Sequence, residues 1–434
     1  MLSSASQYNR AEAARRETDY RFQQVRTLAK SLMFDVYDKI DLVPGSTGAK
    51  VELAEAAQAY LDSLATDSRA SDELRIETAS GLVRLSDIQG TPGFSSLQKV
   101  GLADENLARA KAILIPMESA EPKSDALLLA LGSLYAGLSD ASLYVESDVE
   151  KALEENDKAQ AMYAAYLERH PDDLSNRFQY LAMRGNQAIM EYRGNDREAA
   201  LKTLDSVIAA FDGALAAHPD STRLLDGLAR TQRIQSEVLT NSDRAEEGVA
   251  AATASLETLA RMRKLMPADT VTYWRARGFS LWRRAYALYR TGQPERAVDD
   301  YKAAIAISNQ RIALDADDAD ARQNLATYNG EMAYPLLDLK RLDEAEQSLL
   351  AATQWFQDRY EKSPDKGAYQ RNMLVQHVQL HEFYKGWGNH EAERCFHLAE
   401  IKRFADIMEA AGTMLESDRP EIADYFVQYP LCKD

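Results

Sequence analysis

The chain has 434 residues, of which 45% are apolar, enough to build a large buried core. The 12 prolines and 20 glycines are too few for an all-β protein rich in turns, and alternating strand patterns are scarce. With 51 basic and 68 acidic residues the net charge is −17, so the chain as a whole repels nucleic acid and anionic membrane unless positive charge gathers locally. Composition therefore favours an acidic, all-α protein that does not bind nucleic acid.

No stretch reaches the 18 or more apolar residues typical of a transmembrane helix, and the longest candidate, 126–138, suits a buried helix. Residues 1–10 lack the apolar core of a signal peptide. As written, the chain is expected to stay in the compartment where it is made.

A long helix is predicted over 11–40, where apolar residues recur every three or four positions on one face and arginines occupy the other. It ends in a turn over 43–48. The Gly-Ser-Thr-Gly order within that turn could cradle a phosphate, but it lacks the spacing and the lysine of a P-loop, so a turn is the favoured interpretation. A second helix is predicted over 51–64.

Small residues then recur along the chain at intervals of 47 to 49 positions. They are Ala56, Ala103, Ala152, Ala200, Gly248, Ala297, Ala345 and Ala392. Apolar and small residues tend to follow four and seven positions later, on the same helix face. A small residue beside a large one lets a neighbouring helix approach closely, so each of these positions predicts a helix–helix contact.

Prolines at a similar period divide the chain into helical hairpins, because proline stops the helix that it follows. The acidic or hydroxyl residues after Pro171 and Pro219, and Asp317-Asp318 after Ala316, can cap the next helix. The first (A) helices are predicted over 125–146, 173–192, 221–239, 270–290, 318–337 and 366–384. The second (B) helices are predicted over 148–169, 196–217, 243–265, 293–314, 341–362 and 389–413.

Gly292, Ala297, Tyr301 and Ala304 have the spacing that marks a tetratricopeptide repeat, and this part of the chain resembles that family. The period of 48 exceeds the usual length of about 34 residues, which predicts hairpins elongated by about two turns in each helix. The resemblance implies an α-solenoid of about eight hairpins whose A helices line a concave, peptide-binding face. We expect a division into 1–45 (the first helix), 46–124 (divergent repeats), 125–413 (the regular array) and 414–434 (a cap or tail).

A second resemblance rests on short runs near the N-terminus and in two later repeats. These are RFQQVRTLA (21–29), FDVYDKI (34–40), LVPGST (42–47), YLDSLA (60–65), DIQG (87–90), ARQNLA (321–326) and YQRNML (369–374). They are similar to the helical-repeat ectodomain of bacterial membrane-spanning serine/threonine kinases of the Hanks type. That resemblance implies a periplasmic sensor region, with the 11–40 helix leading toward a membrane segment outside the given chain.

No kinase motif is present: the chain has no Gly-rich loop with its lysine, no His-Arg-Asp loop and no Asp-Phe-Gly. We therefore expect a non-catalytic module that binds a ligand or a protein and holds no cofactor. A homodimer is one possible assembly. The alternative is a free-standing cytoplasmic scaffold or co-chaperone that binds peptides. A metal-dependent enzyme ranks third.

The predicted A helix over 270–290 carries the candidate ligand-binding surface, because it interleaves arginines with aromatics and has no acidic residue. Its candidates are Tyr273, Arg275, Arg277, Trp282 and Arg283. Two earlier A helices could extend the surface with Arg177, Tyr180, Arg184, Arg230 and Arg233. Guanidinium groups pair with carboxylates, so an acidic peptide is the expected ligand. In the alternative, the aromatics pack in the core and the arginines bind neighbours such as Asp299, Asp300 and Asp315.

Four of the six histidines lie near the C-terminus. His377 and His381 are one helical turn apart and could bind a metal with Cys395 or His397. Ordinary polar positions in a terminal hairpin are the favoured explanation, and no metal is assigned. Cys395 and Cys432 are expected to be unrelated thiols, with a bridge as the alternative. The segment 416–434 is expected to cap the last hairpin.

Overall fold

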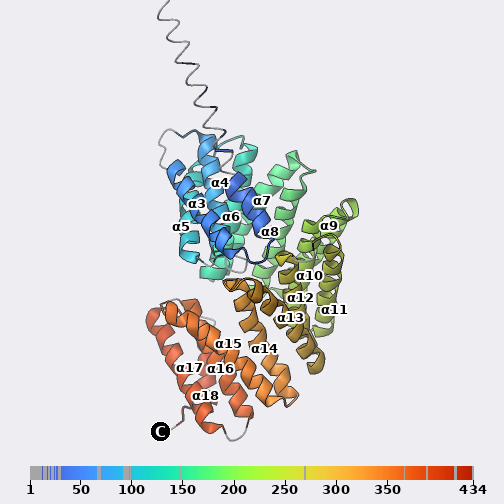
Figure 1. Ribbon diagram of the computed structural model, residues 1–434, viewed down its shortest axis with the longest axis vertical. Helices are drawn as coiled ribbons and strands as arrows, with labels where there is room; N and C mark the ends of the chain where they lie inside the picture. The colour runs from blue at the N-terminus through green and yellow to red at the C-terminus, as the bar shows by residue number, and fades with distance from the viewer. Residues whose placement is uncertain are drawn as a thin grey trace, which may run out of the picture. The chain divides into compact units, whose positions relative to one another are not determined.

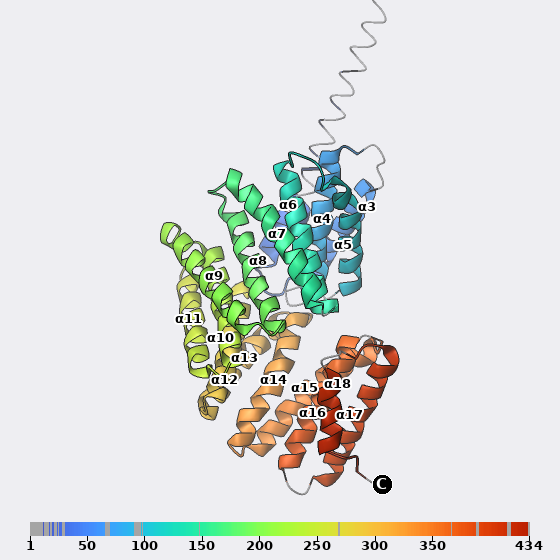
Figure 2. The same ribbon diagram turned by 180° about the vertical axis from the view of Figure 1, so that it is seen from behind.

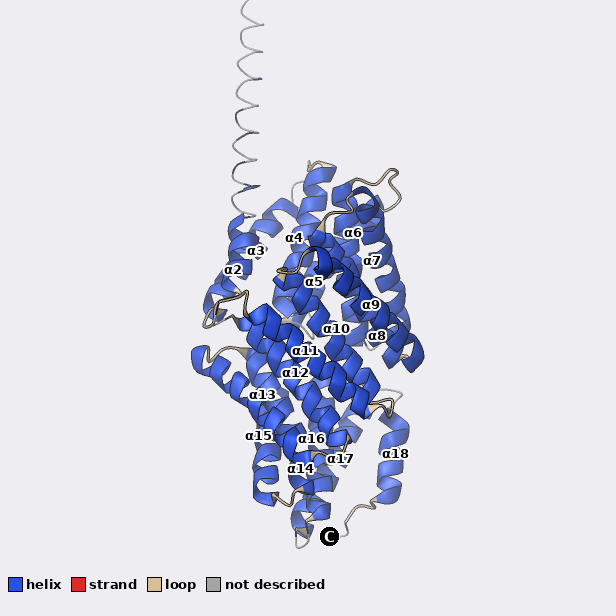
Figure 3. Cartoon of the chain, turned by 90° about the vertical axis from the view of Figure 1, so that its right-hand side faces the viewer, coloured by secondary structure: helices blue, strands red, loops and turns tan. Residues whose placement is uncertain are grey.

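The computed structural model describes residues 12, 17, 20, 24, 26, 27, 31–65, 70–90, 97, 99–146, 148–267, 270–365, 367–387, 390–414 and 418–432. Every regular element among them is a helix, and none of them forms a strand (Figure 3). The chain divides into two compact units, one of Met1–Asp196 with Pro267–Thr272 and one of Arg197–Met266 with Tyr273–Asp434. Each is described by itself.

Unit 1 is built from helices that pack in sequence-adjacent pairs, α4 on α5 and α6 on α7, with α8 beside α7 (Figure 2). Its elements are η1 (Ser31–Asp35), α2 (Val36–Ile40), α3 (Thr47–Ala65), α4 (Asp72–Gly90), α5 (Val100–Leu114), η2 (Ile115–Met117), α6 (Asp125–Ala141), η3 (Ser142–Glu146), α7 (Val149–Arg169) and α8 (Leu174–Arg193).

Unit 2 continues the same alternation, with each helix packed on the next along much of the array (Figure 1). Its helices are α9 (Arg197–Ala217), α10 (Thr222–Thr240), α11 (Ala245–Arg263), α12 (Val271–Arg290, whose first two residues are assigned to unit 1), α13 (Pro294–Leu314), α14 (Ala319–Asp338), α15 (Leu342–Lys362), α16 (Gly367–Gly386), α17 (Glu391–Ala411) and α18 (Asp418–Gln428). The predicted all-α solenoid of elongated hairpins is confirmed, and the helix bounds from 125 onward are close to those predicted.

The A helices begin where the sequence placed their caps. The side chains of Asp173, Ser221 and Asp318 accept hydrogen bonds from the backbone N–H groups of Asn176, Leu224 and Ala321, respectively. Each bond satisfies a donor that the first turn of a helix leaves unpaired. Gly292 supplies the turn between α12 and α13 with a φ of +73°, a conformation that costs glycine little.

The period of small residues is confirmed in the interior of the array and wrong at both ends. Ala152, Ala200, Ala297 and Ala345 are fully buried, as their role in helix contacts requires. Ala56 and Ala392, by contrast, are exposed.

The first hairpin instead buries Ala57, Leu61 and Leu64 of α3. The last hairpin buries Leu398 and Ile401 of α17, leaving Phe396 57% exposed. The contact face is therefore shifted by one residue in the first B helix and by two in the last. The terminal hairpins have a neighbour on one side only, so the spacing between repeats is less constrained there.

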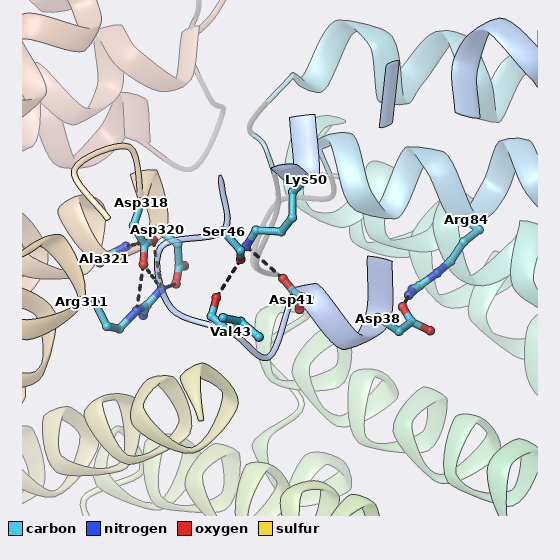
Figure 4. A network of polar contacts seen from close by, with 10 residues as sticks. All are labelled: Asp38, Asp41, Val43, Ser46, Lys50, Arg84, Arg311, Asp318, Asp320 and Ala321. Carbon is cyan, nitrogen blue, oxygen red and sulfur yellow. Dashed lines mark hydrogen bonds and ion pairs between the residues drawn. The ribbon is translucent and has the colours of Figure 1, made fainter. Parts of the chain in front are cut away.

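Two loops show how polar contacts fix the ends of helices (Figure 4). In unit 1, the Ser46 hydroxyl donates to the Val43 carbonyl at 2.7 Å, and the Lys50 ammonium lies 3.1 Å from the Asp41 carboxylate. Gly45 and Ser46 therefore belong to a turn, as predicted, whereas Thr47 and Gly48 already belong to α3, which begins earlier than the predicted 51. In unit 2, the Arg311 guanidinium binds the carboxylates of Asp318 and Asp320 at the start of α14.

Most of the predicted 11–40 helix lies outside the described residues, whose continuous part here begins at η1. Among them, one helical stretch, Asp125–Tyr144, is apolar and long enough to cross a membrane, and 67% of its apolar window is buried inside the protein. That burial agrees with the core helix predicted over 126–138. The domain divisions expected at 45, 124 and 413 stay predictions.

Candidate functional site

The candidate surface lies on α10, α12 and α14 of unit 2, three A helices joined by side-chain contacts. Between α10 and α12, the Arg283 guanidinium pairs with the Glu237 carboxylate at 2.6 Å, and Arg233 lies 4.9 Å from the centre of the Phe279 ring. Between α12 and α14, the indole N–H of Trp282 donates to Glu331 at 2.6 Å. We call this the A-helix layer of unit 2.

Glu331 is the acidic centre of this layer. Its carboxylate accepts hydrogen bonds from Trp282 and from the Tyr301 hydroxyl, the latter at 3.1 Å. Burial raises the pKa of the Glu331 carboxyl, while the nearby Arg283 opposes that rise. Arg283 also stacks on Trp282, with its guanidinium carbon 3.8 Å from the ring centre. Trp282 and Arg283 are thus held in place from both neighbouring helices.

Toward the start of the same helices the surface becomes strongly basic. Asp226 of α10 is surrounded by the arginines Arg223, Arg230, Arg233 and Arg275, all of which act on its titration. Burial raises the pKa of the Asp226 carboxyl in spite of them. We call these five residues the arginine cluster.

Arg233 stands out within the arginine cluster. Burial lowers the pKa of its guanidinium to about 10, and the positive charges of Arg230 and Arg283 add to this effect. The described residues offer it the Phe279 ring and no hydrogen-bonded carboxylate. Arg275 likewise has no ion pair or hydrogen bond among the described residues.

Arg277 and Tyr273, which were also predicted on α12, stay predictions as ligand contacts. Arg277 lies about 200° around the helix from Arg275, at 3.6 residues per turn, on the face that holds the buried Leu281 and Arg284. Arg284 binds Asp300 of α13 through two hydrogen bonds of 2.7 and 2.9 Å. Tyr273 packs under the Arg263 guanidinium at 5.6 Å.

The alternative interpretation is therefore correct for Arg284 and for Asp300 as its partner. The structure separates the arginines of α12 into two sets. Arg284 braces the hairpin, and Arg275 lies in the arginine cluster.

The predicted extension on α8 belongs to unit 1. Arg177 donates to the Pro171 carbonyl, and Tyr180 packs against the hydrophobic core of that unit. Arg184 has contacts of its own within the described residues. The α8 residues therefore stay a prediction as ligand contacts.

The expectation for the cysteines is wrong. Cys395 of α17 and Cys432 are joined by a disulfide that spans 37 residues of sequence and ties the chain end to the last hairpin. The bridge also removes Cys395 as a thiolate ligand. No group of three or more metal-binding side chains lies together among the described residues, and His377 and His397 contact each other instead.

The helix α18 of the C-terminal segment contacts the last hairpin through several side chains. Asp418 of α18 accepts two hydrogen bonds from Arg371 of α16 at 2.6 and 3.0 Å. Tyr425 bonds to His381, and Lys385 lies over the Tyr429 ring at 4.5 Å. Ile422 adds an apolar contact with the core of the hairpin.

Sequence reasoning missed the partners of the arginines. Asp226, Glu237, Phe279 and Glu331 were not singled out, although they set the charge and the orientation of the layer. A signal existed, because Asp226, Arg230, Arg233 and Glu237 follow one another at steps of three or four and so share a face of α10.

No family model matches the chain, and no curated protein matches it at the significance required. Among solved structures, it is similar to a Rap protein complexed with competence and sporulation factor, at 12% identity over 92% of each chain, with a TM-score of 0.51. NprR in complex with its cognate peptide NprX gives 12% identity over 85% of this chain and 88% of that one, with a TM-score of 0.48. The TPR-like repeats of a Podosopora anserina putative kinesin light chain give 18% identity over 55% of this chain and 97% of that one, with a TM-score of 0.36. The chain has a TPR-like helical-repeat fold.

Proposed function

We propose that this chain is a non-catalytic binding module that captures an acidic peptide or protein segment on the A-helix layer of unit 2. The observation that carries the proposal is the arginine cluster. Asp226 faces four arginines there, in a chain whose net charge is −17. Such a reversal of sign attracts an anionic partner and rejects a basic one.

The aromatic side chains beside the cluster favour a peptide over a small anion. Phe279 and Trp282 are both partly exposed, and their ring centres lie 6.2 Å apart. Aromatic and arginine residues provide most of the binding energy at protein interfaces. The Rap protein with this fold was solved with a bound factor, which supports a ligand-binding role here.

A peptide-display selection on the immobilised protein tests the proposal. We expect enriched peptides to be acidic and to lose binding when Arg275→Glu reverses one charge of the arginine cluster. The matched control is Arg277→Glu, which makes the same change on the opposite face of α12 and should leave binding intact. Circular dichroism must show the same helical content in both variants. Peptides that bind all three proteins equally would contradict the proposal.

We further propose that the module is the extracytoplasmic sensor region of a receptor-type serine/threonine kinase. The resemblance over 21–90 supports this, as does the disulfide between Cys395 and Cys432, because such bonds persist in oxidising compartments. The reading frame upstream of residue 1 provides the test. We expect a membrane-spanning segment preceded by kinase motifs, and a frame without them would favour a cytoplasmic scaffold.

A further inference from the structure

We propose that the bridge between Cys395 of α17 and Cys432 is a thiol–disulfide exchange site, at which an external thiol opens the bond and Cys395 leaves as a thiolate beside Arg394. The site lies at the C-terminal end of unit 2, on elements other than those of the A-helix layer. It is independent of the ligand proposed for that layer.

The guanidinium of Arg394 lies against the bridge. Its Nη2 atom is 4.0 Å from Sγ of Cys395 and 3.9 Å from Sγ of Cys432, so that one cation contacts both sulfurs. A closed disulfide carries no charge, whereas an opened one contains a thiolate, which a neighbouring arginine stabilises. The contact therefore favours the opened state over the closed state.

The charge of Arg394 is only weakly neutralised by the protein. Among the described residues its ion pair is with Glu391, at 3.7 Å, and the Glu391 side chain is 86% exposed. An exposed pair at that distance contributes little. Arg403 of the same helix, by contrast, makes contacts of 2.6 to 3.0 Å with Glu400. The positive charge of Arg394 is thus available to a thiolate, and that of Arg403 is held by a carboxylate.

The bridge lies at the surface of unit 2. Cys395 and Cys432 are both partly exposed. Phe396, which follows Cys395, is 57% exposed, and Leu431, which precedes Cys432, is 47% exposed. An attacking thiol can therefore reach the sulfurs while the protein stays folded, and exposed disulfides are the ones that thiols reduce readily.

The backbone around the two sulfurs indicates which one is attacked. A thiolate attacks along the line of the bond, from the side opposite the leaving sulfur. Cys395 has helix α17 behind it, whereas Cys432 lies in a non-helical segment beyond α18. Sγ of Cys432 is therefore the more open to attack, and Sγ of Cys395 is the leaving atom.

The exchange takes two steps and uses two external thiols. The first forms a mixed disulfide with Cys432, while the Cys395–Cys432 bond breaks and its electron pair goes to Cys395. The second thiol attacks the external sulfur of the mixed disulfide and releases Cys432. Two electrons and two protons pass to the protein, and the two external thiols become one disulfide.

Reduction of the oxidised full chain tests the site, with freed thiols trapped by maleimide and counted by mass spectrometry. The reductants are glutathione, which is anionic, and dithiothreitol, which is uncharged below the pKa of its thiols. We expect Arg394→Gln to slow both reactions about three- to tenfold, because the leaving thiolate loses its cation. An unchanged or faster rate would overturn the proposal. A slowing confined to glutathione would overturn it as well, since Arg394 would then merely attract the anion.

Two further variants separate charge from structure. Arg394→Lys keeps the charge and should react within about twofold of the parent protein. Arg403→Gln removes a charge from the same helix away from the sulfurs and should react at the rate of the parent protein. If Arg403→Gln slowed the reaction as much as Arg394→Gln, the contact with the bridge would have no part in the exchange.

The mixed disulfide identifies the leaving sulfur. When the reaction with glutathione is quenched early with acid and labelled with maleimide, we expect glutathione on Cys432 and maleimide on Cys395. The reverse pattern would overturn the assignment of Cys395 as the leaving group. In glutathione redox buffers, Arg394→Gln should also shift the equilibrium toward the closed bridge. A variant that merely loosened the surroundings of the bridge would shift it the other way.

Discussion

The Nδ1 atoms of His377 on α16 and His397 on α17 lie 3.0 Å apart in the interior of the last hairpin. The two side chains are buried, and the His377 ring stacks on Phe404. At this distance one Nδ1 must donate a hydrogen and the other must accept it, so the acceptor ring is neutral. Protonating both rings would place two N–H groups against each other.

This pair predicts acid sensitivity. Burial lowers the pKa of His377 to about 4 and that of His397 to about 4, and each ring in the unfolded chain titrates near its usual 6.5. Between these values the unfolded state binds more protons, so the contribution of this pair to the free energy of unfolding is constant above about pH 6.5 and falls as the pH drops toward 4. We expect each histidine to contribute a loss of about 2 to 3 kcal/mol, measured by urea denaturation at pH 7.5 and 4.5.

The double variant His377→Gln/His397→Gln should unfold at lower urea concentration at pH 7.5 but lose less stability on acidification. His218→Gln, at an exposed position, should keep the acid sensitivity of the parent protein. If the free energy of unfolding of the double variant changed with pH as that of the parent protein does, groups other than these two histidines would be responsible for the acid sensitivity.

Gly248 marks the one position of the small-residue period where even alanine is too large. A Cβ built there would lie 2.2 Å from the Thr240 hydroxyl and 3.1 Å from the Ser236 carbonyl of α10. The hydroxyl cannot move freely, because it donates to that carbonyl at 2.7 Å. We expect Gly248→Ala to lower the free energy of unfolding by about 1 to 3 kcal/mol, against the helix propensity of alanine.

Gly213→Ala is the matched control in the neighbouring B helix α9. An added Cβ there meets no atom within 4 Å. It should raise stability by about 0.5 to 1 kcal/mol, because alanine favours the helix. Thermal unfolding of both variants checks the pair, and two shifts of the same sign would contradict a close approach of α11 to α10.

The fold was predictable because it depends on local signals that recur. The caps Ser221 and Asp318 start their helices where proline or the period marks a break, and the buried Ala200 and Ala297 lie where the period puts them. The contact faces of the terminal hairpins were predicted wrongly, because their shift by one or two residues depends on tertiary packing.

The candidate site was predictable only in part. Composition located the basic helix α12, but which arginines are neutralised depends on carboxylates of other helices, such as Glu237 for Arg283 and Asp300 for Arg284. Helical geometry alone could have separated Arg277 from Arg275. The disulfide required knowing where the chain end folds back, which the sequence does not encode locally.

Substitution of the buried Arg311 is expected to cause a large loss of stability. It is 3% exposed and binds Asp318 and Asp320, and Asp318 also caps α14 through the Ala321 N–H (Figure 4). Removing it leaves two half-buried carboxylates without their cation. We expect Arg311→Ala to lower the free energy of unfolding by about 3 to 5 kcal/mol in chemical denaturation.

The control is Arg341→Ala, which breaks the pair with Glu344 at the surface. That loss should stay below about 1 kcal/mol, because exposed ion pairs contribute little. If the two variants lost similar free energies of unfolding, the contact of Arg311 with the start of α14 would stabilise the protein no more than an exposed ion pair does.

The disulfide between Cys395 and Cys432 should stabilise the C-terminal cap. Closing a loop of 37 residues removes about 3 to 4 kcal/mol of chain entropy from the unfolded state in the loop-closure account. The double variant Cys395→Ser/Cys432→Ser should therefore unfold at lower denaturant concentration.

The amide hydrogens of α18 should exchange faster in the double variant than in the parent protein, because local opening of this helix is then no longer limited by the bridge. The contacts of Asp418 and Tyr425 should still hold α18 against the last hairpin for most of the time. Reductant should reproduce this in the parent protein and have no effect on the serine variant. If the reduced parent protein, with both thiols titrated as free, unfolded at the same denaturant concentration as the oxidised protein, a stabilising role for the bridge would be refuted.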